Sequence, residues 1–346
     1  MKLIAKNEIM KKIILTIVLI SFTLIAFSQK PKNLVFEGGG IRGIAYAGVV
    51  YELEHGGYMS GIEKVGGTSA GAITALFIAL DYKSSEIENI ISQTEFKEFN
   101  DGQYMFIGGI SRFKETYGWY RHGEFEQWLE KIIKDKTGNA DITFAELSQK
   151  GFRDLYITAT CLNKQKLIVF SKENYPNMKV KDAVVSSMSI PLYFEAVFID
   201  SLGNRFDKQN AQNTLDIVVD GGILGNYPIF LFDETTTDSL GHSSRIPNPF
   251  TVGVRIDTEN QIKNDSINQE LVEMPITDIT SYMNAFYNII IENLNRPQLN
   301  DQDWKRTISV SSVGIGPKIK NLSEEQKNAL VESGKKSARK YLSNLE

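Results

Sequence analysis

A serine framed by glycines, Gly67-Thr68-Ser69-Ala70-Gly71, has the spacing of a nucleophile that forms acyl-enzymes. In a G-x-S-x-G turn between a strand and a helix, the serine sits on a tight bend that lifts its Oγ clear of the sheet. Gly67 and Gly71 lack a Cβ where the strand and the helix approach each other closely. The following helix directs its free N–H groups and positive dipole toward the reacting centre. Ser69 is therefore the candidate nucleophile.

A second glycine-rich loop lies upstream, Gly38-Gly39-Gly40-Ile41-Arg42-Gly43. Acyl transfer builds negative charge on the carbonyl oxygen, and each backbone N–H group fixed toward that oxygen contributes roughly 3–4 kcal/mol. Consecutive glycines let the main chain turn inward with its N–H groups exposed. Arg42 would hold the loop in shape or add positive potential. This loop predicts an oxyanion hole.

The same loop also matches a dinucleotide-binding fingerprint, Gly38-x-Gly40-x-x-Gly43. That fingerprint expects an acidic residue about 20 residues further on, at the end of the second strand. Here the second strand ends in glycines before Ser69, and Glu63 lies ahead of it. A nucleotide-binding enzyme that uses this loop stays as an alternative, although the acidic residue that would support it is missing.

Asp220-Gly221-Gly222 follows an apolar run of residues 217–219. A carboxylate at the C-terminal end of a strand, followed by two glycines, is well placed to face a site above the sheet. Taken alone, the pattern also describes an ordinary turn aspartate. Asp220 is therefore a candidate base only in combination with the other two segments.

A serine triad needs an imidazole, and the chain has only His55, His122 and His242. We expect each of them to be a solvated surface residue. Only His242 follows both Ser69 and an acid, as the chain order of an α/β-hydrolase triad requires, so it is the fallback base. A Ser–Asp dyad needs no histidine.

The flanking residues predict the elements that position these groups. Around the Gly38–Gly43 loop, residues 33–36 predict a strand and residues 44–54 a helix. Around the Ser69 turn, Lys64-Val65 predicts a strand and residues 72–80 an apolar helix. Strand–turn–helix twice over indicates an α/β fold, a three-layer α/β/α arrangement on a mostly parallel central sheet. Further strands are predicted over 154–161, 166–170, 217–219 and 250–256, further helices over 125–134, 180–187, 277–294 and 323–342, and polar loops over 201–213 and 260–268.

The N-terminus predicts export. Lys11 and Lys12 precede an apolar stretch over 13–27 and small residues before Gln29, which is typical of a secretory signal peptide, residues 1–28, cut after Ser28. An uncleaved anchor helix is the alternative, but fifteen apolar residues fall short of the ~20 that span a bilayer. We expect a periplasmic, outer-membrane-associated or secreted protein, with one catalytic domain over 33–342 that is helical from about 277.

Composition and charge argue against nucleic acid, metal ions and cofactors as binding partners. Removing residues 1–28 takes away four lysines and one glutamate, which changes the formal net charge from −4 to −7. No basic field is available for nucleic acid. The single cysteine, Cys161, lies in an apolar run and predicts a small buried residue. No His, Cys and Asp cluster has metal-ligand spacing, so neither a metal nor a cofactor is expected.

Together, the three glycine-rich segments resemble the patatin-like phospholipase family, whose members carry Gly-Gly-Gly-x-Arg/Lys-Gly, Gly-x-Ser-x-Gly and Asp-Gly-Gly/Ala in this order. The resemblance runs from about residue 33 to 228 and includes Ser187-Met188-Ser189-Ile190-Pro191. It implies that Ser69 is the nucleophile and Asp220 its base, that the acyl group passes to Ser69 as an ester, and that water then releases the acid. It also implies an oxyanion hole from the N–H groups of Gly39, Gly40 and Ile41.

The implied substrate is a lipid or acyl ester. Aromatic and apolar residues crowd the segment 104–128, where they would line an acyl channel, touch a membrane surface or simply pack in the core. A charge of −7 disfavours anionic bilayers, so neutral or zwitterionic lipids are expected. A non-catalytic lipid-binding protein on the same scaffold stays as a further alternative.

Overall fold

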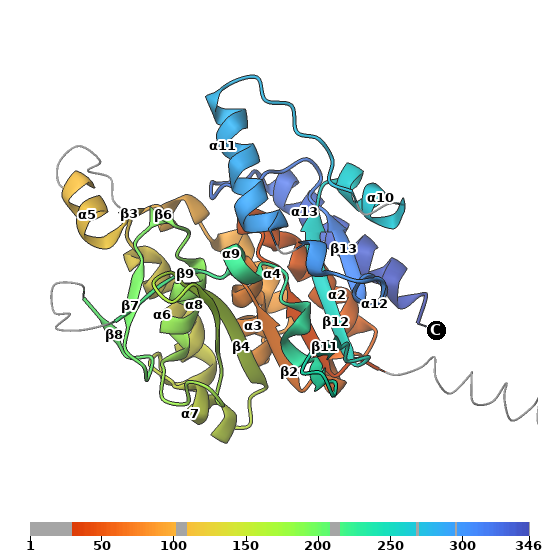
Figure 1. The fold of residues 1–346 in the computed structure, drawn as a ribbon, viewed down its shortest axis with the longest axis horizontal. Helices are drawn as coiled ribbons and strands as arrows, with labels where there is room; N and C mark the ends of the chain where they lie inside the picture. Colours follow the sequence, from red (N-terminus) through yellow and green to blue (C-terminus); the bar gives the residue numbers. More distant parts are fainter. Residues whose placement is uncertain (1–29, 102–108, 208–214, 268–269, 295, 346) are drawn as a thin grey trace, which may run out of the picture.

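The computed structural model describes residues 30–101, 109–207, 215–267, 270–294 and 296–345. A nine-stranded mixed sheet forms its centre (Figure 1). Five neighbouring strands are parallel: β13 (Thr307–Ser311), β12 (Thr251–Asp257), β1 (Asn33–Phe36), β2 (Lys64–Gly67) and β4 (Asp154–Cys161). Antiparallel strands continue the sheet beyond β4: β9 (Asp216–Asp220), β7 (Val197–Ile199) and β8 (Arg205–Phe206), with β5 (Lys166–Phe170) paired to the second half of β4.

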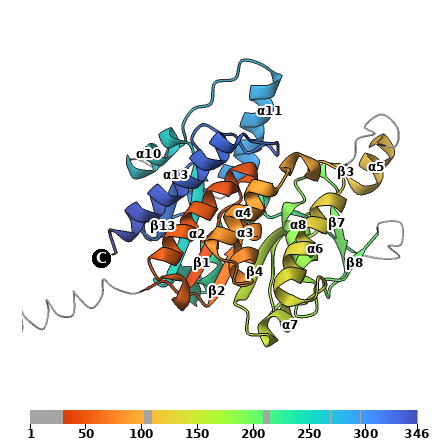
Figure 2. The same ribbon diagram turned by 180° about the vertical axis from the view of Figure 1, so that it is seen from behind.

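Helices cover both faces of the sheet, which confirms the three-layer arrangement. Figure 2 shows the thicker layer: α2 (Ala45–His55), α3 (Ala70–Ala79), α4 (Ser84–Gln93), α6 (Gly123–Thr137), α7 (Phe144–Gln149), α8 (Val180–Met188) and α13 (Glu324–Leu342). The opposite face carries shorter elements: α9 (Gly222–Gly225), η5 (Ile229–Phe232) and the hairpin of β10 (Glu234–Thr237) and β11 (Ser243–Ile246).

Shorter elements complete the chain: the 3-10 turns η1 (Gly40–Ile44), η2 (Met59–Gly61), η3 (Phe96–Phe99) and η7 (Arg296–Gln298), the π-helix η6 (Asn288–Asn293), the helices α5 (Gly109–Thr116), α10 (Glu259–Ile267), α11 (Ile279–Tyr287) and α12 (Asp301–Lys305), and the parallel pair β3 (Gly118–Tyr120) and β6 (Leu192–Phe194).

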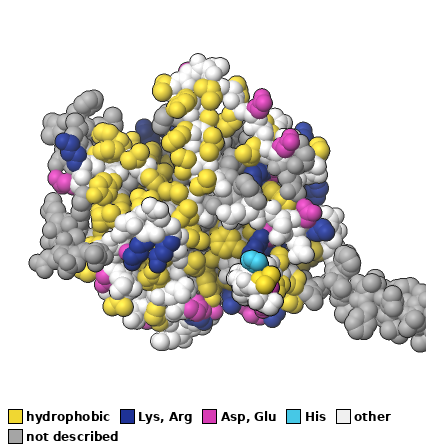
Figure 3. All heavy atoms as spheres, viewed as in Figure 1, with side chains coloured by type: hydrophobic (Ala, Val, Ile, Leu, Met, Phe, Trp, Pro, Cys, Tyr) yellow, Lys and Arg dark blue, Asp and Glu magenta, His cyan; other side chains and the backbone are white. Residues whose placement is uncertain are grey.

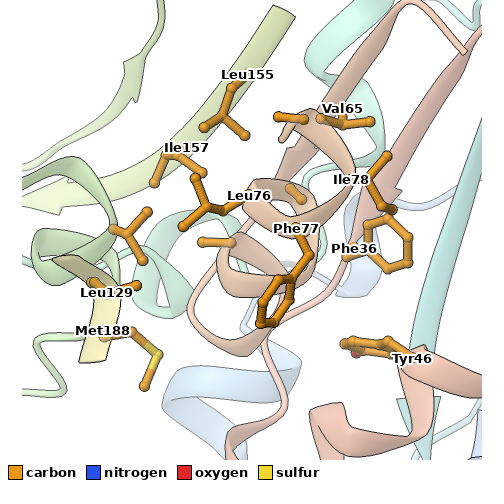
Figure 4. Packing of buried hydrophobic residues seen from close by; sticks show 14 of the residues in the cluster. Phe36, Tyr46, Val65, Leu76, Phe77, Ile78, Leu129, Leu155, Ile157 and Met188 are labelled. Carbon is orange, nitrogen blue, oxygen red and sulfur yellow. The ribbon is translucent and has the colours of Figure 1, made fainter. Parts of the chain in front are cut away.

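The core lies between the first strands and α3. All four residues of β1 are buried, as expected for a strand covered on both faces. Figure 4 shows Leu76 and Ile78 of α3 among Phe36, Val65 and the neighbouring strand residues. Nine of the ten α3 residues are buried, so the prediction of a helix enclosed on most sides is confirmed. This packing anchors the turn that precedes α3.

One predicted loop is wrong. The sequence predicts a polar loop over residues 260–268, but α10 occupies residues 260–267, and residue 268 lies outside the described residues. The buried side chains of α10 are polar and are satisfied by polar partners. Asp265 pairs with Arg255 and Arg296, and Gln261 donates to Asp265. A helix held by ion pairs carries no apolar stripe that periodicity could detect.

Most other predicted elements are present, and Cys161 is buried as expected. In the predicted loop 201–213, β8 forms a short strand against β7, and residues 208–213 lie outside the described residues. The signal peptide, residues 1–28, also lies outside them, so cleavage after Ser28 stays a prediction. Across the described ranges, no helix combines the length and apolar character that a membrane crossing needs.

Candidate active site

Ser69 occupies the sharp turn between β2 and α3, which confirms the predicted nucleophile elbow. Its φ of 52° and ψ of −122° lie in a region that non-glycine residues rarely adopt. Such strain persists only where the surroundings enforce it. The surroundings here are close: a Cβ at Gly67 would lie 2.3 Å from the Gly71 carbonyl oxygen, and one at Gly71 would lie 2.3 Å from the Phe36 carbonyl oxygen. The two framing glycines let β1, β2 and α3 approach each other.

This close approach predicts a stability effect. We expect Gly71→Ala to lower the free energy of unfolding by about 1–3 kcal/mol, because the added methyl group would meet rigid backbone. Gly61→Ala is the matched control, since a Cβ there meets only Pro31 O at 3.5 Å, an ordinary contact. Chemical denaturation of both variants checks the prediction. Equal stabilities would contradict the tight strand–helix packing.

Asp220 lies level with the elbow, although not in the way the sequence suggests. The sequence pattern predicts a strand end above a mostly parallel sheet, but β9 runs antiparallel to β4. Register explains the juxtaposition: β4 pairs Ile157 with Gly67 on β2 and Ala159 with Asp220 on β9. Asp220 therefore lies beside the residues that immediately follow β2.

The carboxyl of Asp220 is buried and poorly solvated. Burial raises the pKa of Asp220 to about 7, against the opposing effects of the Gly222 N–H and of Ser69. Oδ1 accepts the Gly222 N–H at 2.7 Å. Oδ2 is buried and makes no hydrogen bond within the described residues, although Ser69 lies near enough to influence the pKa. In this arrangement the Ser69 hydroxyl is directed instead at Sδ of Met188, 3.4 Å away.

The C-terminal end of α8 holds both groups in place. The Ser69 N–H donates to Oγ of Ser187 at 2.8 Å, and the Asp220 N–H donates to the carbonyl of Ser189 at 2.8 Å. In the sequence, residues 187–191 stand out only through the family resemblance. Ser187, Met188 and Ser189 each contact the elbow or the acid, a role that only the packing of α8 reveals.

The glycine loop lies against the elbow. A Cβ at Gly38 would come within 3.3 Å of the Ser69 Cβ, and one at Gly43 within 2.7 Å of the Ala70 Cβ. Gly40 has a φ of +55°, which favours glycine. Arg42 is buried, and its Nε donates to the Gly39 carbonyl at 3.0 Å, so its guanidinium holds the loop in shape.

One expected oxyanion donor is engaged elsewhere. The Ile41 N–H donates to the carbonyl of Pro317 at 3.2 Å. Pro317 comes from the segment between β13 and α13, far along the chain, so no local pattern indicates this contact. The structure therefore corrects the expected donor set: Gly39 and Gly40 stay as the candidates, and Ile41 is occupied.

The histidines do not assemble a triad. His242 is exposed in the turn between β10 and β11, where its Nδ1 lies 3.2 Å from Asp238 Oδ2. His55 is also exposed, at the end of α2. His122 corrects the expectation of a surface residue: it is buried, its Nε2 lies 3.0 Å from Ser189 Oγ, and burial lowers its pKa to about 3. The neutral imidazole contacts the side chain of Ser189, whose carbonyl accepts the Asp220 N–H.

An apolar cavity opens beside the elbow. Its enclosed volume is about 60 Å³, and it extends from the glycine loop between α2, α3, α4 and α6. Its lining is Gly40, Ile41, Gly43, Ile44, Ala47, Ala70, Ile73, Thr74, Phe77, Ile87, Ile91, Phe96, Phe99, Trp128, Met188 and Ile319. Of the predicted aromatic segment, Trp128 lines this cavity, and residues 104–107 lie outside the described residues.

The sequence profile of patatin-like phospholipases matches residues 34–233. This chain belongs to that family. The match includes Ser69, Asp220 and the glycine loop, and it makes the protein an ester hydrolase. No group of three or more His, Cys, Asp or Glu side chains suited to a metal ion occurs within the described ranges.

Similar proteins span much of this patatin-like chain. R571 of Acanthamoeba polyphaga mimivirus is 28% identical over 91% of this chain and 94% of its own length. YqhO of Bacillus subtilis is 34% identical, over 58% of this chain and 66% of YqhO. Among solved structures, VipD of Legionella pneumophila superposes with a TM-score of 0.53 at 16% identity, covering 91% of this chain and 67% of VipD, which indicates a shared fold.

Proposed function

We propose that the protein hydrolyses carboxylic esters of lipids through an acyl-enzyme on Ser69, with Asp220 as the base. The carrying observation is the strained elbow of Ser69 beside a buried carboxyl whose Oδ2 makes no hydrogen bond to any described residue. Ser69 influences the pKa of this carboxyl, and in the reaction its hydroxyl would exchange its weak contact with Met188 for a hydrogen bond to that oxygen.

In the first half-reaction, Ser69 Oγ bonds to the acyl carbon as its proton passes to Asp220 Oδ2. The carbonyl oxygen becomes an oxyanion, which the N–H groups of Gly39 and Gly40 and the N-terminus of α3 stabilise. The intermediate collapses, the ester C–O bond breaks, and the leaving alcohol takes the proton from Asp220. Water then attacks the acyl-enzyme as its proton passes to Asp220, the bond between Ser69 Oγ and the acyl carbon breaks, and Asp220 returns the proton to Oγ as the free acid leaves.

The cavity supports a lipid substrate. Its lining is almost wholly apolar, and it begins at the residues that flank the nucleophile, Gly40, Ala70 and Met188. An acyl chain placed there would be removed from water while its carbonyl lies at Ser69. The headgroup side would be neutral or zwitterionic, since the chain without residues 1–28 carries a formal charge of −7.

Release of fatty acid from phosphatidylcholine, phosphatidylserine and triacylglycerol, together with cleavage of p-nitrophenyl butyrate and palmitate, tests this function. We expect hydrolysis of the long-chain and the zwitterionic or neutral substrates. Absence of hydrolysis on the whole panel would contradict the proposal and favour a non-catalytic lipid-binding protein.

Filling the cavity should change chain-length preference. Ile73 lines the cavity on α3, one helical turn beyond Ser69. We expect Ile73→Trp to lower kcat/KM for the palmitoyl ester relative to the butyryl ester by about tenfold or more, since each lost methylene contact is worth about 1–3 kcal/mol. Ile90→Trp on α4 is the matched control, because Ile90 does not line this cavity. An unchanged preference for Ile73→Trp would place the acyl chain elsewhere.

Asp220 predicts the pH dependence. As a base, the carboxyl must be ionised, and its pKa is raised from 3.8 to about 7. We expect kcat/KM to be low at pH 5, to rise through pH 7 and to level off above pH 8, because the ionised fraction follows that curve. A profile of p-nitrophenyl butyrate hydrolysis between pH 5 and 9 measures this. A plateau that already begins at pH 5 would contradict a base with this pKa.

A further inference from the structure

An apolar stripe runs along the outer side of α11 and η6. Helical spacing of three, four and three residues places four side chains on one face, and each is more than half exposed: Ile279 (73%), Tyr282 (54%), Phe286 (53%) and Ile289 (59%). Amphipathic helices normally turn such a stripe toward the core. Here the stripe faces solvent instead, and an exposed apolar surface of this kind marks a site of contact with a partner.

The element that ends the stripe packs near the active site. η6 packs against α9, and α9 begins two residues after Asp220. Figure 1 shows α11 projecting above α9. In Figure 3, hydrophobic side chains follow this projection and continue over the neighbouring surface.

The charge of the segment that carries the stripe indicates which kind of lipid surface it fits. Residues 271–294 contain three acidic residues, Glu273, Asp278 and Glu292, and no lysine or arginine. Interfacial helices that bind anionic membranes carry basic residues on their polar side, which the negative surface potential attracts. A segment with only acidic charges gains nothing from an anionic bilayer, whereas burial of its apolar stripe stabilises contact with any hydrocarbon boundary.

We propose that the stripe of Ile279, Tyr282, Phe286 and Ile289 docks the enzyme on a neutral or zwitterionic lipid surface, with the active site facing the membrane. The proposal rests on the proposed function in one respect, since it names the physical form in which the lipid substrate is met. Tyr282 suits this position, because its ring has an apolar body and a polar tip. The ester would then reach Ser69 without crossing bulk water.

Partitioning onto phosphatidylcholine vesicles tests this surface, measured by sedimentation in a Ser69→Ala background so that the lipid stays intact. We expect Ile279→Ser/Phe286→Ser to weaken partitioning by about tenfold, since two large apolar side chains no longer enter the lipid. Leu202→Ser/Leu240→Ser is the matched control: both leucines are more than 60% exposed, but they lie in the β7–β8 and β10–β11 turns. We expect this variant to bind as its parent does.

Three results would overturn the proposal. One is equal partitioning of the stripe variant and its parent. Another is binding that strengthens as phosphatidylserine replaces phosphatidylcholine. A third is a dimeric parent that becomes monomeric in the stripe variant, because the stripe would then be an interface between two copies. Partitioning is measured without turnover. A wild type that hydrolyses no ester could therefore still bind vesicles through the stripe, so the docking proposal and the proposed hydrolase function can fail separately.

Discussion

Ser69→Ala is expected to lower kcat for every ester substrate by about 10⁴-fold or more, because it removes the atom that bonds to the acyl group. The variant should fold normally, since alanine fills the same space and the bond from the residue 69 N–H to Ser187 Oγ uses only backbone of that residue. A fluorophosphonate probe should label the wild type on Ser69 and leave the variant unlabelled, as mass spectrometry of the labelled peptide would show.

Ser92→Ala provides the matched control for this result. Ser92 is exposed on α4, where its Oγ donates to the Asn89 carbonyl, and the variant should keep both its activity and its labelling. Ester hydrolysis that survives in Ser69→Ala would show that Ser69 is not the nucleophile.

Asp220→Asn is expected to lower kcat by about 10³-fold, because the amide cannot accept the proton of Ser69 or of the attacking water. The contact between Asp220 Oδ1 and the Gly222 N–H can persist through the amide oxygen, so the geometry survives. His242→Ala should keep its rate, since His242 lies in an exposed turn. The opposite pattern, an active Asp220→Asn and a dead His242→Ala, would replace the dyad with a triad.

Stability provides an independent control for Asp220→Asn. The folded pKa of Asp220 is raised, so ionisation costs the native state free energy. That cost is fully present above about pH 7 and is relieved as the pH falls through 7 toward the unfolded value near 4. Asparagine does not ionise, so the variant should melt no lower than the wild type at pH 8. Loss of activity without loss of stability would then report on chemistry rather than on unfolding.

Several features of this protein follow from local patterns of residues. The glycines that frame Ser69 predict its strand–turn–helix context, because the turn leaves no room for a Cβ. The apolar run over 72–80 predicts a buried helix, and α3 is one. Periodicity fails where polar contacts replace apolar ones, as in α10, whose buried Asp265 is satisfied by two arginines from outside the helix.

By itself, the amino-acid sequence determined the family, the α/β class and the identity of the candidate nucleophile and acid, since these depend on short segments with strict steric needs. Tertiary structure alone decided how the segments meet. The antiparallel direction of β9 brings Asp220 level with Ser69, Pro317 takes the Ile41 N–H, and burial behind Ser189 makes His122 neutral. Each of these depends on residues far apart in the chain, whose contacts and desolvation arise only once the sheet and its helices have packed.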